Sequence, residues 1–544
     1  MEEQKKELQT KTDNVIELSQ LTDHLIQALA KIKERGPVDD YSKLTVSQTV
    51  SFLALVYEKV RNAIEYREDH LIRRAAIERI LRRRLSMNPE GRNEAENVLR
   101  ELMWARYFAN GSLGQHDIHE VQKIIESFID VRKKVLVGRN YKHRQYLSNF
   151  LFELFTAEIE EFLSPAESKI EADFTYFIFQ TLRDKVKIED TDEKQRDTLL
   201  FIAIENTYRK SDRPYQRYHL FRLFYKPISQ YHEHEAEEIL TKLPDIFDKI
   251  DSLIDNPTTE KLVRFTRKLL PPYLILFSII RKHRKEIGTI LSDKSALWSK
   301  VEQTARQKYS QVRSRLNILA FRSLVYIFIT KMLLAIIIEV PLSQLIYKEV
   351  SYVAIGINSL FPAFLMLVII LFVTLPGEDN TKRLFFRIVE IINADPTYEK
   401  SIALITKKIK HRRPILVFGF TLLYSSTFIV TLYLIHLGLR YIHFNLLSEA
   451  LFIFFISVVA FFAYRIKQLA NKYRLTERAG IFSPLVDFFF MPILSLGKIF
   501  SEGVSYLNFF ILIFDFIIEA PFKLIIEVIE EWISFVRQKK EEIV

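Results

Sequence analysis

Four apolar stretches in the second half of the chain constrain its fold more than any other feature. They cover residues 323–346, 352–375, 414–439 and 446–464. A helix that crosses a hydrocarbon core about 30 Å thick needs roughly 20 mostly apolar residues, and each stretch is about that long or longer. We therefore expect an all-α, polytopic helical membrane protein in which these stretches span the bilayer.

The scarcity of glycine supports a helical fold. The chain has 13 glycines among 544 residues, well below the usual share of about 7%. This composition disfavours a β-barrel and glycine-rich phosphate-binding loops. The chain also contains no cysteine, which excludes disulfides, thiolate zinc sites and cysteine nucleophiles. We expect no cofactor.

The distribution of positive charge predicts the orientation in the membrane. The net charge is +10, and basic residues concentrate in the connection 376–413 and in the segment after residue 464. The other two connections carry one basic residue each, Lys348 and Arg440. Lys and Arg in short loops favour the cytoplasmic side. The pattern predicts cytoplasmic N- and C-termini, in a bacterial-type inner or plasma membrane.

The chain divides into three parts by composition. Residues 1–320 show apolar side chains at helical spacing, which predicts a large cytoplasmic all-helical domain. Residues 321–466 form the four-helix transmembrane region, with its basic loop at 376–413. Within the first part, the apolar run 269–280 is shorter than a crossing helix, so we expect a buried or interfacial segment there.

Residues 467–544 are predicted to contain a basic linker, a hairpin and an amphipathic helix. Two short apolar segments within 482–518 are compatible with a hairpin that dips into the bilayer, crosses it or lies on it. Beyond them, charged residues recur at every fourth position: Asp515, Glu519, Lys523, Glu527 and Glu531. On a helix this spacing makes one polar strip beside an apolar face, which is typical of an interfacial helix.

Ionisable residues inside the apolar stretches are the first candidate functional residues. Lys331 and Glu339 lie in the first stretch, His436 in the third and Glu449 in the fourth. A charge near the bilayer centre costs several kcal/mol, so such residues face a wet cavity or a partner. Eight residues of helix separate Lys331 from Glu339 by about 12 Å, so we expect partners on other helices. These ionisable residues would either line a path for ions or protons, or pair with each other and so fix how the helices assemble.

Three positions in the apolar stretches could interrupt a helix: Asn358 and Pro362 in the second stretch and Gly419 in the third. Transporters use interrupted helices to expose backbone carbonyls to a substrate. Small and hydroxyl-bearing residues also serve as ordinary packing contacts between membrane helices. Packing is the favoured interpretation here.

An arginine-rich segment at residues 70–85 is the second candidate. Its apolar residues have helical spacing, and the arginines include Arg73, Arg74, Arg82, Arg83 and Arg84. Such a face is either solvated or paired within the protein, which we favour, or it contacts anionic lipid. Nucleic acid is disfavoured because no aromatic residues are interleaved with the arginines.

Two histidine clusters, His116 with His119 and His232 with His234, are accompanied by carboxylates. Neither matches the H-E-x-x-H zinc motif, so we predict charged surfaces and no metal site.

The chain contains no nucleotide-binding or common hydrolase motif. We therefore predict a non-enzymatic, membrane-anchored interaction or scaffold module that binds the lipid bilayer and a cytoplasmic protein. One alternative is an ion channel or secondary transporter that uses Lys331 and Glu339. A weaker alternative is a lipid-handling membrane enzyme with carboxylates such as Asp487 and Asp515. The sequence is also compatible with a homo-oligomer.

Overall fold

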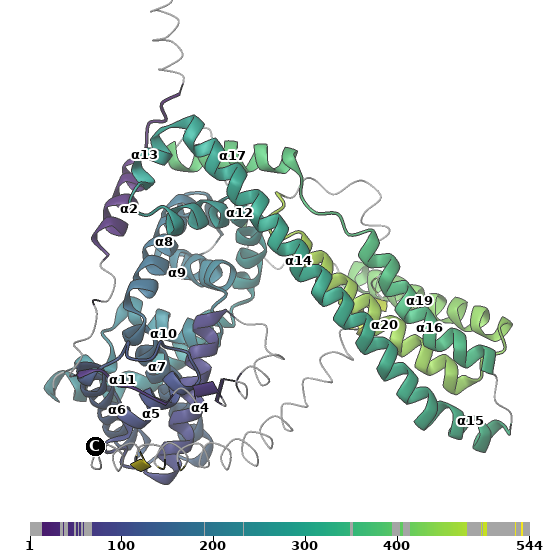
Figure 1. Ribbon diagram of the computed structural model, residues 1–544, viewed down its shortest axis with the longest axis horizontal. Coiled ribbons are helices and arrows are strands. Elements are labelled where there is room, and N and C mark those ends of the chain that lie inside the picture. Colours follow the sequence, from purple (N-terminus) through teal and green to yellow (C-terminus); the bar gives the residue numbers. More distant parts are fainter. Residues whose placement is uncertain are drawn as a thin grey trace, which may run out of the picture. The chain divides into compact units, whose positions relative to one another are not determined.

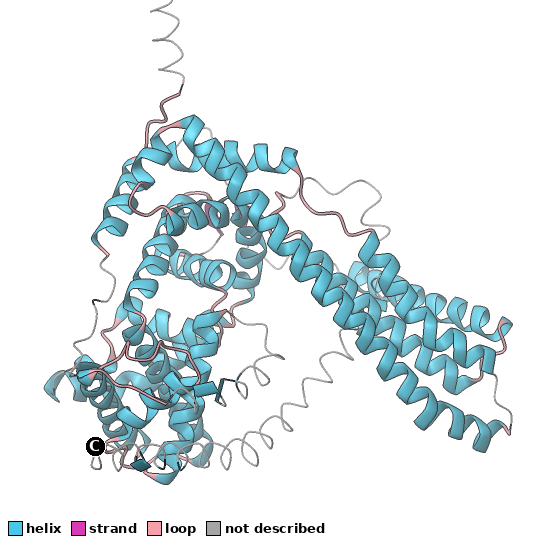
Figure 2. Cartoon of the chain, viewed as in Figure 1, coloured by secondary structure: helices cyan, strands magenta, loops and turns pink. Residues whose placement is uncertain are grey.

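The described part of the computed structural model is almost entirely helical, which confirms the all-α part of the predicted fold class (Figure 2). It describes residues 14–32, 36, 42–47, 51–52, 54–55, 58, 68–189, 191–231, 233–348, 352–393, 403–405, 414–475, 491, 493–497, 528, 532 and 535–536. The chain divides into two compact units. The predicted interfacial helix with Asp515 and Glu519, and most of the predicted hairpin, lie outside the described residues.

The first unit, here called the helical domain, comprises Gln20–Arg267, strand β2 and the described residues after 511. Its helices are α2 (Gln20–Lys31), α4 (Asp69–Met87), α5 (Glu94–Trp104), α6 (Gln115–Leu136), α7 (Tyr141–Leu163), α8 (Pro165–Arg183), α9 (Glu193–Ile204), α10 (Arg213–Phe224), α11 (Glu233–Ile254) and the start of α12 (Pro257–Lys282). A π-helical turn η2 (Glu205–Arg209) follows α9, and a 3-10 turn η3 (Ile228–Gln230) precedes α11. Strands β1 (Val186–Ile188) and β2 (Ala403–Ile405) form one parallel pair.

Helix α7 is the centre of the helical domain, because α4, α6 and α10 all pack against it. It starts where the side chain of Asn140 accepts a hydrogen bond from the backbone N–H of His143 at 2.9 Å, which caps the helix. Phe150 of α7 stacks on Phe247 of α11 with 3.8 Å between ring centroids. Burial of such aromatic side chains supplies much of the stability of a helical core.

The second unit, here called the apolar unit, contains the rest of the described chain. Its elements are the end of α12, α13 (Ile287–Ser292), α14 (Lys294–Leu334), the π-helical turn η4 (Ala335–Glu339), α15 (Val340–Tyr347), α16 (Tyr352–Leu371), α17 (Glu378–Asn393), α19 (Pro414–Tyr441) and α20 (Leu446–Ala470). Helices α14, α16 and α20 pack side by side (Figure 1).

Four helical segments of the apolar unit are long and apolar enough to cross a membrane: Lys294–Ile346, Tyr352–Leu371, Phe418–Tyr441 and Leu446–Ala470. Each overlaps one of the four stretches identified from sequence. The first is longer than expected, because α14 starts in a polar segment and runs without a break past residue 320, where the sequence suggested a domain boundary.

The short apolar run 269–280 lies within α12, which continues through Pro271 and Pro272. Among its side chains, Tyr273, Leu276 and Ile279 are fully buried. Their burial within the protein explains why this run is apolar although it is too short to cross a membrane.

Candidate functional site

Lys331 and Glu339 meet directly in the apolar unit. Lys331 Nζ lies 3.2 Å from Glu339 Oε2, and both side chains are 0% exposed. The expectation that eight residues of helix hold them too far apart is wrong. The axial separation is spanned by two long side chains that point toward each other, and both lie on one face of the helix.

The π-helical turn η4 places them on the same face. In a regular helix, residues eight apart differ by about 80° around the axis. A π-turn adds one residue and rotates the rest of the helix by about 100°, which brings the two side chains nearly into line. Pro341 lies just after η4. It has no N–H to donate and its ring clashes with the carbonyl four residues earlier, which disfavours a regular α-turn there.

Asn358 joins this ion pair to two further helices. Its side-chain NH₂ donates to Glu339 Oε1 at 2.7 Å and to the backbone carbonyl of Ser448 in α20 at 3.1 Å. Lys331 Nζ also lies 5.0 Å from the ring centre of Phe455 in α20, a cation–π contact. The sequence had marked Asn358 as a packing residue, and the structure makes it the link between η4, α16 and α20.

A second polar pair lies next to this cluster. Glu449, adjacent to Ser448 in α20, contacts His436 Nδ1 of α19 through Oε1. Asn445 caps α20 by accepting a hydrogen bond from the backbone N–H of Ser448, and it donates to Ser343 Oγ at 2.9 Å. The two groups of contacts are joined only by the consecutive residues Ser448 and Glu449 of α20. Their six members are here called the polar chain: Lys331, Glu339, Asn358, Ser448, Glu449 and His436.

Two buried polar atoms of α16 lie at the polar chain, one on its member Asn358 and one on the neighbouring Ser359. Asn358 Oδ1 and Ser359 Oγ have no hydrogen-bond partner among the described residues. An unsatisfied buried polar group is costly, and each of these two oxygens is able to accept a hydrogen bond.

In the helical domain, the five α4 arginines proposed from sequence all pair with carboxylates. Arg73 Nη2 lies 2.7 Å from Glu160 Oε1, and Arg74 Nη2 lies 3.1 Å from Asp212 Oδ2. The remaining contacts join Arg82 to Glu78, Arg83 to Glu101, and Arg84 to Glu94 and Glu101. Pairing within the protein is thus the arrangement found. Contact of this face with anionic lipid stays a prediction.

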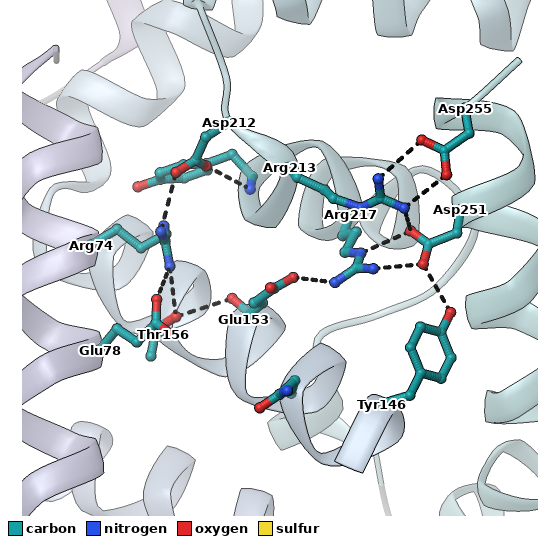
Figure 3. Close-up of polar contacts among 12 residues, drawn as sticks. Arg74, Glu78, Tyr146, Glu153, Thr156, Asp212, Arg213, Arg217, Asp251 and Asp255 are labelled. Atoms are coloured by element: carbon teal, nitrogen blue, oxygen red, sulfur yellow. Dashed lines mark hydrogen bonds and ion pairs between the residues drawn. The ribbon is translucent and has the colours of Figure 1, made fainter. Parts of the chain in front are cut away.

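A second arginine network was missed in the sequence. Arg217 of α10 binds Glu153 through Nη1 at 2.6 Å and Asp251 through Nε at 2.8 Å, and Asp251 accepts from the Tyr146 hydroxyl at 2.9 Å (Figure 3). Partial burial alone would raise the pKa of Asp251, but the hydrogen bonds and charge of Arg217, with the hydrogen bond from Tyr146 and the charge of Arg213, together outweigh burial and lower it. The partners lie 64 and 34 residues away from Arg217, so no local pattern reveals them.

His219 lies in a third buried cluster beside η2. Its Nδ1 is 2.7 Å from Glu205 Oε2 and its Nε2 is 3.1 Å from Glu161 Oε1. Burial would lower the pKa of His219, but the charge of Glu205 and the hydrogen bond to Glu161 outweigh burial and raise it above 6.5. The stability that His219 contributes is present below its ordinary pKa and is lost as the pH rises through the raised value.

Glu158 of α7 is buried beside a water-sized cavity of about 10 Å³ that Phe128, Phe155 and Ser229 help to line. The Ser229 hydroxyl donates to Glu158 Oε1. Burial raises the pKa of Glu158 from 4.5 to about 7. Between these values the folded state holds a proton that the unfolded state has released, so stability falls as the pH rises through this window.

Glu158→Gln is therefore expected to flatten the pH dependence of folding. The loss of unfolding free energy between pH 5 and pH 8 should shrink by about 2–3 kcal/mol, the magnitude of a shift of this size. Denaturant unfolding of the full chain in detergent at both pH values measures it. Glu193→Gln, at an exposed position, is the control and should leave the difference unchanged. An equal pH dependence in Glu158→Gln and wild type would contradict the assignment.

The histidine clusters show no metal-binding geometry in the part of the chain that the structure describes. No group of three or more His, Cys, Asp or Glu side chains is placed to hold a metal ion there. His116 lies against the ring of Phe162, with 6.4 Å between centroids. His232 and the side chain of His234 lie outside the described residues.

No protein-family model matches this chain, and searches of curated proteins and of solved structures found no significant match. Function is therefore inferred from the chemistry of the polar groups and of the surfaces that carry them.

Proposed function

We propose that the chain is a multi-pass integral membrane protein, with the four long apolar segments as its spans. The support is the large apolar surface that these helices leave uncovered. On α19, for example, Phe418, Ile429 and Leu434 are all exposed. None of the apolar window of the segment Phe418–Tyr441 is buried, and exposed apolar side chains along a whole helix are typical of a membrane-facing region. The charge distribution supports cytoplasmic termini in a bacterial-type inner or plasma membrane.

Cysteine labelling tests this orientation, because the chain has no native cysteine. Lys348→Cys, in the connection between α15 and α16, should react with a membrane-impermeant maleimide added to intact cells. Lys382→Cys, exposed on α17, should react only after the cells are opened. The reverse labelling pattern would contradict the orientation.

For the activity, we propose a membrane-anchored interaction or scaffold module whose helical domain binds a cytoplasmic protein. One observation carries this proposal: the buried charges of the helical domain pair with each other across α4, α7, α10 and α11. Buried groups matched in this way hold helices in fixed positions and leave recognition to the domain surface.

A second candidate is movement of protons or small ions along the polar chain. It is favoured by the convergence of Lys331, Glu339 and Asn358, and by the two unsatisfied atoms beside them. Intramembrane ionisable residues often mark ion pathways. The weaker alternative, a lipid-handling enzyme, depends on Asp487 and Asp515, which lie outside the described residues.

One pair of proteins distinguishes the two candidates: wild type and the double variant Lys331→Met/Glu339→Gln. The scaffold proposal expects a specific protein to co-purify from detergent extracts with both, and no ion flux in proteoliposomes from either. The ion-path proposal expects flux in wild type that the double variant abolishes. Absence of any specific partner contradicts the scaffold, and absence of wild-type flux contradicts the path.

A further inference from the structure

The turn between α6 and α7 exposes two large apolar side chains. Helix α6 ends at Leu136, Gly138 takes a positive φ of 72°, and Asn140 caps α7. A glycine followed by a capping residue closes a tight helical hairpin. At its end Val137 is 78% exposed and Tyr141 is 80% exposed. They are the most exposed large hydrophobic side chains in the described part of the helical domain.

Basic residues surround these two side chains. The segment 132–144, here called the basic tip, contains six basic residues and no acidic one: Arg132, Lys133, Lys134, Arg139, Lys142 and Arg144. Asp130, just outside it, pairs with Lys134 at 2.8 Å. Lys133, Lys142 and Arg144 are exposed and form no ion pair among the described residues. The α4 arginines differ from them, because carboxylates already compensate those charges.

We propose that the basic tip docks on an anionic bilayer surface. The proposal rests on the proposed membrane location, which places a bilayer within reach of the chain. Lys and Arg side chains gain about 1 kcal/mol each near an anionic leaflet. Tyrosine places its ring at the level of the headgroups, with its hydroxyl in water. The uncompensated charges around Val137 and Tyr141 thus match a lipid surface in both charge and polarity.

The test uses Val137→Cys, which creates the only thiol in the chain. The full chain is labelled there with an environment-sensitive dye. It is then reconstituted in vesicles of phosphatidylcholine alone or of phosphatidylcholine with phosphatidylglycerol. We expect a blue shift, and quenching by spin-labelled lipid, only with phosphatidylglycerol, and both should weaken at high salt. A dye at Tyr176→Cys, an exposed site on α8, should respond to neither lipid.

Charge reversal distinguishes docking through the basic tip from a general attraction between the positively charged chain and anionic lipid. Lys133→Glu/Lys142→Glu/Arg144→Glu should reduce the docked fraction at least about 10-fold, given the energy per basic residue. Lys123→Glu/Lys187→Glu/Lys249→Glu changes the net charge equally at exposed lysines outside the tip and should dock like wild type.

Several outcomes overturn the proposal. One is a dye response that does not depend on phosphatidylglycerol. Another is an equal reduction of the docked fraction in both triple variants. A third is a dye response to added single-stranded RNA in place of lipid. Flotation of the vesicles after an alkaline wash checks membrane integration separately. A chain that floats without a dye response overturns docking alone. A chain that fails to float overturns the membrane location and the docking that rests on it.

Discussion

Lys331→Met is expected to destabilise the apolar unit by about 3–5 kcal/mol, the usual effect of removing one partner of a buried ion pair. The variant leaves the Glu339 carboxylate fully buried, and among the described residues Asn358 remains as its partner. It also removes the cation from the ring of Phe455. Unfolding of the full chain by titration with a denaturing detergent measures the loss.

The double variant Lys331→Met/Glu339→Gln should recover most of that stability. The glutamine carbonyl still accepts from Asn358, and no unpaired charge remains in the apolar interior. Lys467→Met is the matched control, because Lys467 is exposed on α20; its effect should stay within about 0.5 kcal/mol. If Lys331→Met is as mild as Lys467→Met, or if the double variant is no better than the single one, the two side chains are not coupled.

Arg217→Met is expected to destabilise the helical domain by about 3–5 kcal/mol for the same reason. Arg217 is 9% exposed, and its loss leaves Glu153 and Asp251 without their shared cation. It also removes the guanidinium that lies 4.3 Å from the centre of the Phe150 ring, at the core of α7. Hydrogen exchange of α7 and α10 in the full chain reports this loss locally.

Arg213→Met provides the comparison on the same helix. Arg213 also contacts Asp251, but it is 44% exposed, and it donates hydrogen bonds to Asp255, which is 60% exposed (Figure 3). Exposed pairs of this kind contribute about 0–1 kcal/mol. Similar losses from Arg213→Met and Arg217→Met would mean that burial does not govern the strength of this network.

The two networks differ in how far their residues could be found from sequence. Lys331, Glu339 and Glu449 were recognised because a charge in an apolar stretch is conspicuous. The contact between Lys331 and Glu339 was not predicted from sequence, because it depends on the π-turn before Pro341 and on Asn358 from another helix. Arg217 was overlooked because α10 mixes arginine, tyrosine and phenylalanine without a regular apolar face, so its burial leaves no periodic pattern.

The sequence alone determined that the chain is helical and where its long apolar helices lie. The expected stretches 352–375 and 446–464 begin at the same residues as α16 and α20. Length and hydrophobicity are local properties, so a single segment is enough to reveal them. The tertiary structure alone decided which polar groups meet: Asn358 and Ser448 are 90 residues apart, and Arg217 and Glu153 are 64 apart. Such pairs form only when helices distant in the chain pack together, because hydrogen bonds and ion pairs act over a few ångströms.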